Sequence, residues 1–203
     1  MKTHNILYLI ADFNNGEKAI EEALKAKVDY IQLREKNISS AEYLSRAKRL
    51  HKMTYYYHIP LIINDRIDIA QLSNAEGVHL GQSDVPVEEA RKLLGKDIII
   101  GATAKTREQA MEAERQGADY IGSGAWNETS TKLDATPITD ETYKAILEAI
   151  HIPSLAVGGL TVENCDRPLS LGANGLAVSH GILGARDILG VIREFRKKAE
   201  KFC

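Results

Sequence analysis

Short apolar segments alternate with amphipathic segments along the whole chain, and this alternation limits the possible folds more than any other feature. The apolar runs are typical of strands buried on both faces, and the segments between them have helical periodicity. The expected strands are 6–10, 30–33, 61–64, 77–80, 98–101, 120–122, 154–157 and 176–179. The expected helices are 17–25, 41–57, 66–72, 87–94, 107–116, 140–149, 162–171 and 187–198. Such alternation predicts a parallel sheet covered by helices.

The joints between helix and following strand resemble one another, which indicates one βα unit used repeatedly. Residues 27–31, 74–78, 117–121 and 172–176 each contain a short polar residue just before the strand. Eight such units predict a TIM (β/α)8 barrel, because open doubly wound sheets usually have fewer strands. A doubly wound sheet with two weak additional strands is the alternative. No linker interrupts the chain, so residues 1–203 are expected to form a single domain.

Composition narrows the possible partners. The chain has 26 Lys and Arg against 28 Asp and Glu, a net charge of −2, so it has no overall positive field to attract nucleic acid. No apolar run approaches the roughly 20 residues that a membrane-spanning helix needs. The first ten residues lack the pattern of a signal peptide. We expect a cytoplasmic protein that binds small molecules and neither nucleic acid nor membrane.

Cationic and amide side chains end the second expected strand. Gln32 and Arg34 lie two residues apart and so share one face of the strand, and Lys36 follows. An Arg offers a bidentate fork to phosphate, and a Lys adds a mobile charge. The pattern favours a site for a polyanionic ligand. The alternative is an exposed strand end held by salt bridges.

Two aspartates end neighbouring units. Asp65 follows the third strand and Asp84 follows the fourth. Mg²⁺ commonly binds one or two carboxylates together with substrate phosphates, so this pair predicts a magnesium site beside the cations. The alternative is that each Asp caps the N-terminus of the next helix.

Small and hydroxyl-bearing residues follow the later strands. Thr103 ends the fifth strand, and the long loop 124–139 contains Thr129, Ser130, Thr131 and Lys132. Gly159 and Ser179 follow the seventh and eighth strands, where barrels often bind phosphate through backbone N–H groups. These positions predict a second anion subsite, with a solvated polar loop as the alternative for 129–132. A diphosphate and a monophosphate could then bind side by side at the carboxyl ends of the strands, which form the mouth of the barrel.

Five ordered motifs carry a family resemblance. They are QLREK at 32–36, INDR at 63–66, GVHLGQSD at 77–84, TSTK at 129–132 and GG at 158–159. In order and spacing they resemble the thiamine-phosphate synthase family. The resemblance implies a TIM-barrel transferase that joins 4-amino-2-methyl-5-hydroxymethylpyrimidine diphosphate to a thiazole phosphate. The products would be thiamine phosphate and pyrophosphate, formed by a dissociative substitution without a protein nucleophile.

The resemblance also implies residue roles. The pyrimidine diphosphate would be bound by Gln32, Leu33, Arg34, Glu35, Lys36, Asn64, Thr103 and Lys132. The thiazole phosphate would be bound by Thr129, Ser130, Thr131, Gly159, Val178 and Ser179. Mg²⁺ would be bound by Asp65 and Asp84. The family also permits a homodimer.

Two segments depart from the family pattern. Residues 125–128 read AWNE where the family has a proline-containing segment, and His180 stands where an Ala is usual. A thiazole tautomerase, built on the same barrel, would carry a His at the position of Ala125. That isomerase and a non-catalytic barrel that binds phosphate ligands are the alternative functions.

Overall fold

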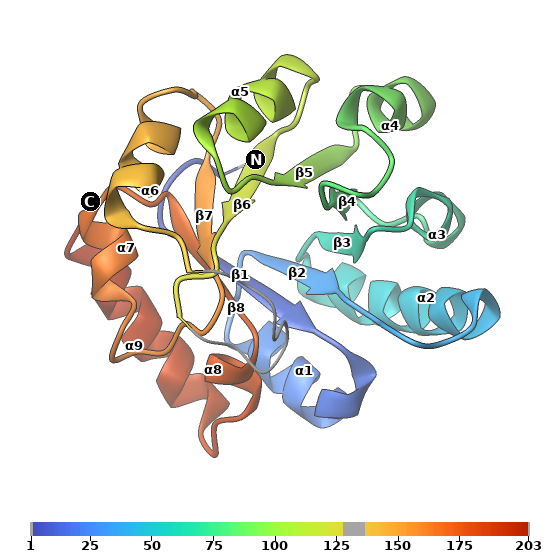
Figure 1. The fold of residues 1–203 in the computed structure, drawn as a ribbon. Helices are drawn as coiled ribbons and strands as arrows, with labels where there is room; N and C mark the ends of the chain where they lie inside the picture. Colours follow the sequence, from blue (N-terminus) through green and yellow to red (C-terminus); the bar gives the residue numbers. More distant parts are fainter. Residues whose placement is uncertain (1, 128–136, 203) are drawn as a thin grey trace.

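The structure is a closed barrel of eight parallel strands with helices around its outside (Figure 1). It is a computed structural model that describes residues 2–127 and 137–202. The strands are β1 (Ile6–Ala11), β2 (Tyr30–Leu33), β3 (Leu61–Asn64), β4 (Gly77–Leu80), β5 (Ile99–Thr103), β6 (Tyr120–Ser123), β7 (Ser154–Val157) and β8 (Gly175–Val178). They follow one another in sequence order, and β8 pairs with β1. The TIM-barrel prediction is confirmed, and the doubly wound alternative is wrong because no strand order reverses.

Helices connect the strands largely where periodicity places them. They are η1 (Phe13–Asn15), α1 (Glu17–Lys25), α2 (Ser40–Tyr57), α3 (Ile67–Ser73), α4 (Val87–Leu94), α5 (Arg107–Arg115), α6 (Asp140–Leu147), α7 (Asp166–Ser170), α8 (His180–Leu183) and α9 (Ile188–Glu200). The helix expected at 162–171 is shorter, because residues 161–165 form a turn in which Asn164 accepts from Thr161 N. The single-turn α8 is too short for periodicity to reveal. No helix in the described ranges is long and apolar enough to cross a membrane.

The repeated joints have a common structural role. Lys27, Asn74, Gly117 and Gly172 all have a positive φ and end their helices in the left-handed region. In all four joints the polar side chain just before the strand accepts from an N–H of the preceding strand. Glu76 Oε2 lies 2.7 Å from Leu61 N, and Asp119 Oδ2 lies 2.7 Å from Ile100 N. Asp29 Oδ2 lies 2.8 Å from Leu7 N. Asn174 Oδ1 lies 2.9 Å from Ser154 N. The repeated sequence pattern therefore reflects hydrogen bonds that connect neighbouring βα units.

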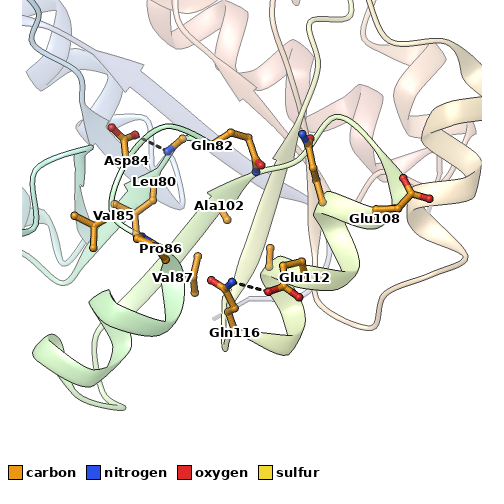
Figure 2. A pocket seen from close by; sticks show the side chains of 13 residues that line it. Leu80, Gln82, Asp84, Val85, Pro86, Val87, Ala102, Glu108, Glu112 and Gln116 are labelled. Atoms are coloured by element: carbon orange, nitrogen blue, oxygen red, sulfur yellow. Dashed lines mark hydrogen bonds between the residues drawn. The ribbon is translucent and has the colours of Figure 1, made fainter.

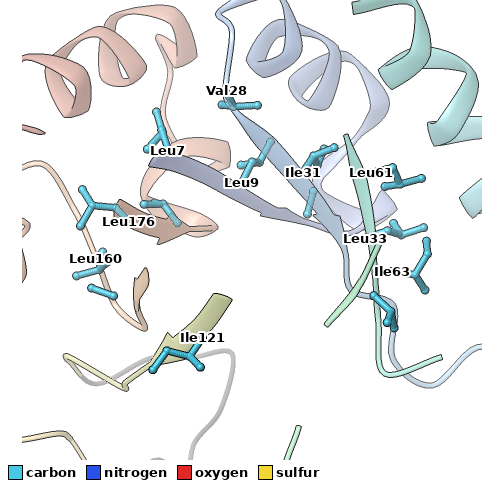
Figure 3. Packing of buried hydrophobic residues seen from close by; sticks show 14 of the residues in the cluster. Leu7, Leu9, Val28, Ile31, Leu33, Leu61, Ile63, Ile121, Leu160 and Leu176 are labelled. Atoms are coloured by element: carbon cyan, nitrogen blue, oxygen red, sulfur yellow. The ribbon is translucent and has the colours of Figure 1, made fainter. Parts of the chain in front are cut away.

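The core has two layers because strand side chains alternate between the faces. Outward residues such as Leu9, Ile31 and Ile63 pack under the helices (Figure 3). Inward residues fill the barrel and include three buried tyrosines, Tyr8, Tyr30 and Tyr120. The inner layer is thus partly polar.

Candidate active site

The candidate site lies at the carboxyl ends of the strands, where TIM-barrel sites are found. Gln32 pairs with Ile62 of the inner cluster, so its side chain faces the barrel interior. Asn64 pairs with His79 one layer higher, and Thr103 pairs with Gly122. Gln32 and Asn64 are buried and Thr103 is half-buried. The fold therefore brings these three predicted residues into one mouth.

The cationic part of the mouth holds Arg34 and Lys36. The half-buried Arg34 side chain has no hydrogen-bond or ion-pair partner among residues 2–127 and 137–202. Lys36 is exposed, and its Nζ lies 2.5 Å from Asp65 Oδ2. Within the described part of the chain no salt bridge holds the Arg34 guanidinium, which suits it to bind an anion.

The two aspartates do not cap helices. Asp65 has a φ of 63°, and its N donates to His79 O at 2.8 Å. Asp84 Oδ2 accepts from Gly81 N at 2.7 Å (Figure 2). Helices α3 and α4 begin after Arg66 and Pro86, and neither has a side-chain cap. The capping alternative is wrong for both aspartates.

The carboxylates of Asp65 and Asp84 are electrostatically linked. Burial raises the pKa of Asp84, and the neighbouring Asp65 carboxyl raises it further, whereas the Gly81 N–H lowers it. Two adjacent carboxylates in a partly buried setting favour a cation, and Lys36 supplies one positive charge. The donor set fits Mg²⁺, whose remaining ligands would be phosphate oxygens and water. The described residues hold no cluster of three or more acidic, His or Cys metal ligands, so protein atoms alone would leave the coordination incomplete.

Asp84 also lines a cavity of about 390 Å³ that extends from the loop after β4 toward α5 (Figure 2). Its floor includes Ala102, which faces the outer core, and its wall includes Glu108 and Glu112 of α5. No Lys or Arg lines it. Its acidic lining is unsuited to phosphate, so we place the reaction in the mouth.

The loop after β7 has the backbone form expected of a phosphate loop. Gly158 and Gly159 have φ values of 103° and 63°. The segment that departs from the family pattern holds this loop, since Asn127 N donates to Gly158 O at 3.2 Å and Asn127 Nδ2 to Gly159 O at 3.3 Å. Trp126 is buried, and its ring meets the Tyr143 ring edge-on with centroids 4.8 Å apart. The unusual residues 125–127 therefore replace the family's proline with a packed, hydrogen-bonded anchor.

The loop after β8 lies against the loop after β7. A Cβ on Gly181 would lie 2.3 Å from Leu160 O, so only glycine allows this approach. Ser179 is half-buried and makes no side-chain cap bond to α8. Val178 is buried in the outer core, so its side chain does not enter the mouth. His180 is exposed, and its ring turns back toward its own helix at Gly184.

Two other predicted residues have side chains directed away from the mouth. Leu33 is fully buried in the outer core. The Glu35 carboxylate accepts from Phe13 N at 3.0 Å and pairs with Arg46 Nη1 at 2.8 Å. Leu33 and Glu35 can therefore meet a ligand only through backbone atoms. The predicted residues Thr129, Ser130, Thr131 and Lys132 lie outside the described residues.

The sequence reasoning missed a hydrogen-bonded chain across the barrel. Gln32 Nε2 donates to Tyr8 Oη at 3.0 Å, and Tyr8 Oη lies 2.8 Å from Tyr120 Oη. His79 Nδ1 lies 3.0 Å from Tyr120 Oη, and His79 Nε2 lies 3.0 Å from Thr103 Oγ1. The sequence did contain a signal for this chain, because β1, β4 and β6 each place an aromatic side chain with a polar atom at an inward position: Tyr8, His79 and Tyr120.

Comparison with known proteins places the chain in a family. The family model described as thiamine monophosphate synthase matches residues 7–182. The chain is 50% identical to the thiamine-phosphate synthase of Clostridium acetobutylicum over 187 residues, which cover 90% of this chain and 89% of that protein. It is 40% identical to the thiamine-phosphate synthase of Methanobrevibacter smithii, with 95% and 96% covered. The solved thiamine phosphate pyrophosphorylase from Pyrococcus furiosus superposes with a TM-score of 0.89 at 34% identity, covering 99% of this chain and 98% of that one. The chain therefore belongs to the thiamine monophosphate synthase family.

Proposed function

We propose that the chain is a thiamine-phosphate synthase, a transferase that joins 4-amino-2-methyl-5-hydroxymethylpyrimidine diphosphate to a thiazole phosphate or its carboxy form. Thiamine phosphate and pyrophosphate are the products. Family membership supports the activity. The observation that supports the assignment to this mouth is that Arg34, which has no ion-pair partner among residues 2–127 and 137–202, lies with Lys36, Asp65 and Asp84 at adjacent strand ends. These four residues combine phosphate donors with a carboxylate pair suited to a divalent cation.

The diphosphate group would lie over the cationic part of the mouth. Arg34 and Lys36 would contact its oxygens, with Asn64 donating from the next strand. Lys132 would complete this set. Asp65 and Asp84 would hold Mg²⁺, which when bound neutralises charge on phosphate oxygens. The cationic side chains stabilise the negative charge of the pyrophosphate, which departs with the electron pair of the breaking C–O bond.

The thiazole phosphate would lie on the opposite side of the mouth. Gly159 and Ser179 would contact its phosphate, and Thr129, Ser130 and Thr131 would contribute hydroxyls. This placement would hold the thiazole nitrogen in line with the carbon that loses pyrophosphate. The aminopyrimidine delocalises the positive charge until the nitrogen donates its electron pair. No side chain has to act as a nucleophile.

The alternative functions have less support. Ala125 offers no acid or base at the position where the tautomerases carry their His, and it is buried. A non-catalytic barrel would have no need of the paired carboxylates. We also propose that the partners are phosphorylated small molecules and not nucleic acid, since the near-neutral net charge does not favour a polyanionic macromolecule. A cytoplasmic location and a homodimer are further proposals that rest on the family resemblance.

The test is a pyrophosphate-release assay with each substrate alone and with both together. We expect release only with both substrates and Mg²⁺. Isomerisation of a carboxythiazole phosphate without any pyrophosphate release would instead show a tautomerase. Release that persists after Mg²⁺ is removed would refute the metal assignment but not the activity.

Two substitutions test the residue roles within this assay. Asp65→Ala should remove most activity at low Mg²⁺, because the metal loses one of its two protein ligands. Near-normal turnover of this variant would contradict the assignment. Lys132→Ala should weaken binding of the pyrimidine diphosphate, and unchanged affinity would remove Lys132 from the site.

A further inference from the structure

The hydrogen-bonded chain inside the barrel connects two residues of the proposed pyrimidine site. Gln32 stands at one end and Thr103 at the other, with Tyr8, Tyr120 and His79 between them. Tyr8 and Tyr120 are each 1% exposed, so their hydroxyls reach neither solvent nor ligand. A role for these phenols in ligand recognition must therefore act through the residues at the two ends.

The barrel is shaped to accommodate this chain. A Cβ on Gly101 would lie 2.1 Å from Tyr120 Cζ, and one on Gly122 would lie 3.3 Å from His79 Cε1. The absence of side chains at these inward positions leaves room for the two rings. Buried hydroxyls are costly unless they are paired, and each one here has a partner on both sides. Loss of one hydrogen bond in the chain would therefore leave a buried hydroxyl without one of its partners.

The chain has a direction because each linking group carries one hydrogen. Burial raises the pKa of Tyr8 and of Tyr120, so both phenols keep their hydrogens. The arrangement in which every hydrogen has its own acceptor has Tyr8 receiving a hydrogen from Gln32 Nε2 and donating its own to Tyr120. Tyr120 then donates to His79 Nδ1. A neutral imidazole that accepts at Nδ1 carries its hydrogen on Nε2 and donates it to Thr103 Oγ1.

The direction determines what the two ends can offer to a ligand. Gln32 Nε2 gives one of its two hydrogens to the chain, which leaves Oε1 as an acceptor beside the second N–H. Thr103 accepts from His79, which leaves its hydroxyl hydrogen to donate. An aminopyrimidine has an amine that donates and ring nitrogens that accept. Its 4-oxo analogue carries a carbonyl in place of the amine and would place two acceptors face to face at Gln32.

We propose that Tyr8, Tyr120 and His79 are positioning residues that hold Gln32 as an acceptor and Thr103 as a donor, and thereby select a 4-aminopyrimidine over its 4-oxo analogue. The inference rests on the proposed function and adds the origin of its ring specificity. Rotating the Gln32 amide to bind a carbonyl would place Oε1 against Tyr8, which requires every link to reverse. The selection is therefore a property of the whole chain.

The test compares Tyr8→Phe with Tyr30→Phe. Tyr30 is a matched control, because its ring lies 6.0 Å from that of Tyr8 in the same inner cluster and its hydroxyl accepts from Lys2 N outside the chain. Dissociation constants for the 4-amino and 4-oxo pyrimidine diphosphates are measured without thiazole phosphate. Tyr8→Phe should weaken binding of the amino compound by about 2- to 12-fold, the range of one neutral hydrogen bond, and should improve relative binding of the oxo compound. Tyr30→Phe should keep the wild-type ratio.

A second measurement needs neither turnover nor a variant. Nitrogen chemical shifts of His79 in the resting enzyme should show the hydrogen on Nε2, and a hydrogen on Nδ1 would overturn the proposed direction. An unchanged amino-to-oxo ratio in folded Tyr8→Phe would also overturn the proposal. If the wild-type enzyme releases pyrophosphate while these results fail, the proposed function stands and only the positioning role is refuted.

Discussion

Replacing His79 should change how stability depends on pH. Burial in the barrel lowers the pKa of His79 to about 4 from its ordinary value of 6.5, with the charge of Asp65 acting weakly in the other direction. The unfolded chain therefore binds a proton at pH 5 that the folded protein does not, and stability falls as the pH drops from 6.5 toward 4. With these two pKa values, His79 alone lowers the free energy of unfolding by about 2 kcal/mol between pH 7 and pH 5. Partial exposure of the ring to the mouth makes this an upper value.

Urea unfolding at pH 7 and pH 5 measures this contribution directly. Between pH 7 and pH 5, the free energy of unfolding should fall by about 2 kcal/mol more in the wild-type protein than in His79→Gln, because Gln does not titrate. His4→Gln is the control, since His4 is exposed and lies outside the barrel interior, and this variant should keep the difference between the two pH values. If wild type and His79→Gln differ by less than about 0.5 kcal/mol, the His79 ring is not held neutral by burial and the reasoning fails.

Three other substitutions test separate features. Gly101→Ala should destabilise the protein by about 1–3 kcal/mol in urea unfolding, because the new Cβ would meet the Tyr120 ring, and an unchanged midpoint would contradict the close fit. Asp84→Asn should raise the melting temperature of the metal-free protein at pH 7 while weakening Mg²⁺ binding, since the raised pKa shows that the fold disfavours this charge. A lower melting temperature would count against that interpretation. Asn127→Ala should raise KM for the thiazole phosphate more than for the pyrimidine diphosphate, because it removes one of the two side-chain hydrogen bonds to the Gly159 carbonyl and leaves only that from Asn164 Nδ2. Equal effects on both substrates would argue against a local anchor.

Local sequence information was sufficient for the barrel. Helix periodicity and short buried strands depend on residues close together in the chain, and the structure places most of these elements as expected. The single-turn α8 and the shortened α7 were missed because a single turn carries too few residues for a periodic signal.

Strand-end residues could be placed in one mouth from the sequence, but their roles could not be separated. Asp65 and Asp84 have spacings that suit helix caps as well as metal ligands, and only the positions of α3 and α4 excluded capping. Likewise, Arg34 and Glu35 are neighbours with different surroundings. The Arg34 side chain has no ion-pair partner in the described ranges, whereas the Glu35 carboxylate pairs with Arg46.

The interior chain was beyond any local pattern. Tyr8 and Tyr120 are 112 positions apart, and their hydroxyls meet only because the barrel closes and Gly101 leaves space for the second ring. Residue spacing along the chain therefore determined which units form and which strand ends could bind phosphate. Only ring closure decided which side chains share a hydrogen bond, because such contacts depend on distances in space between residues that are remote in sequence.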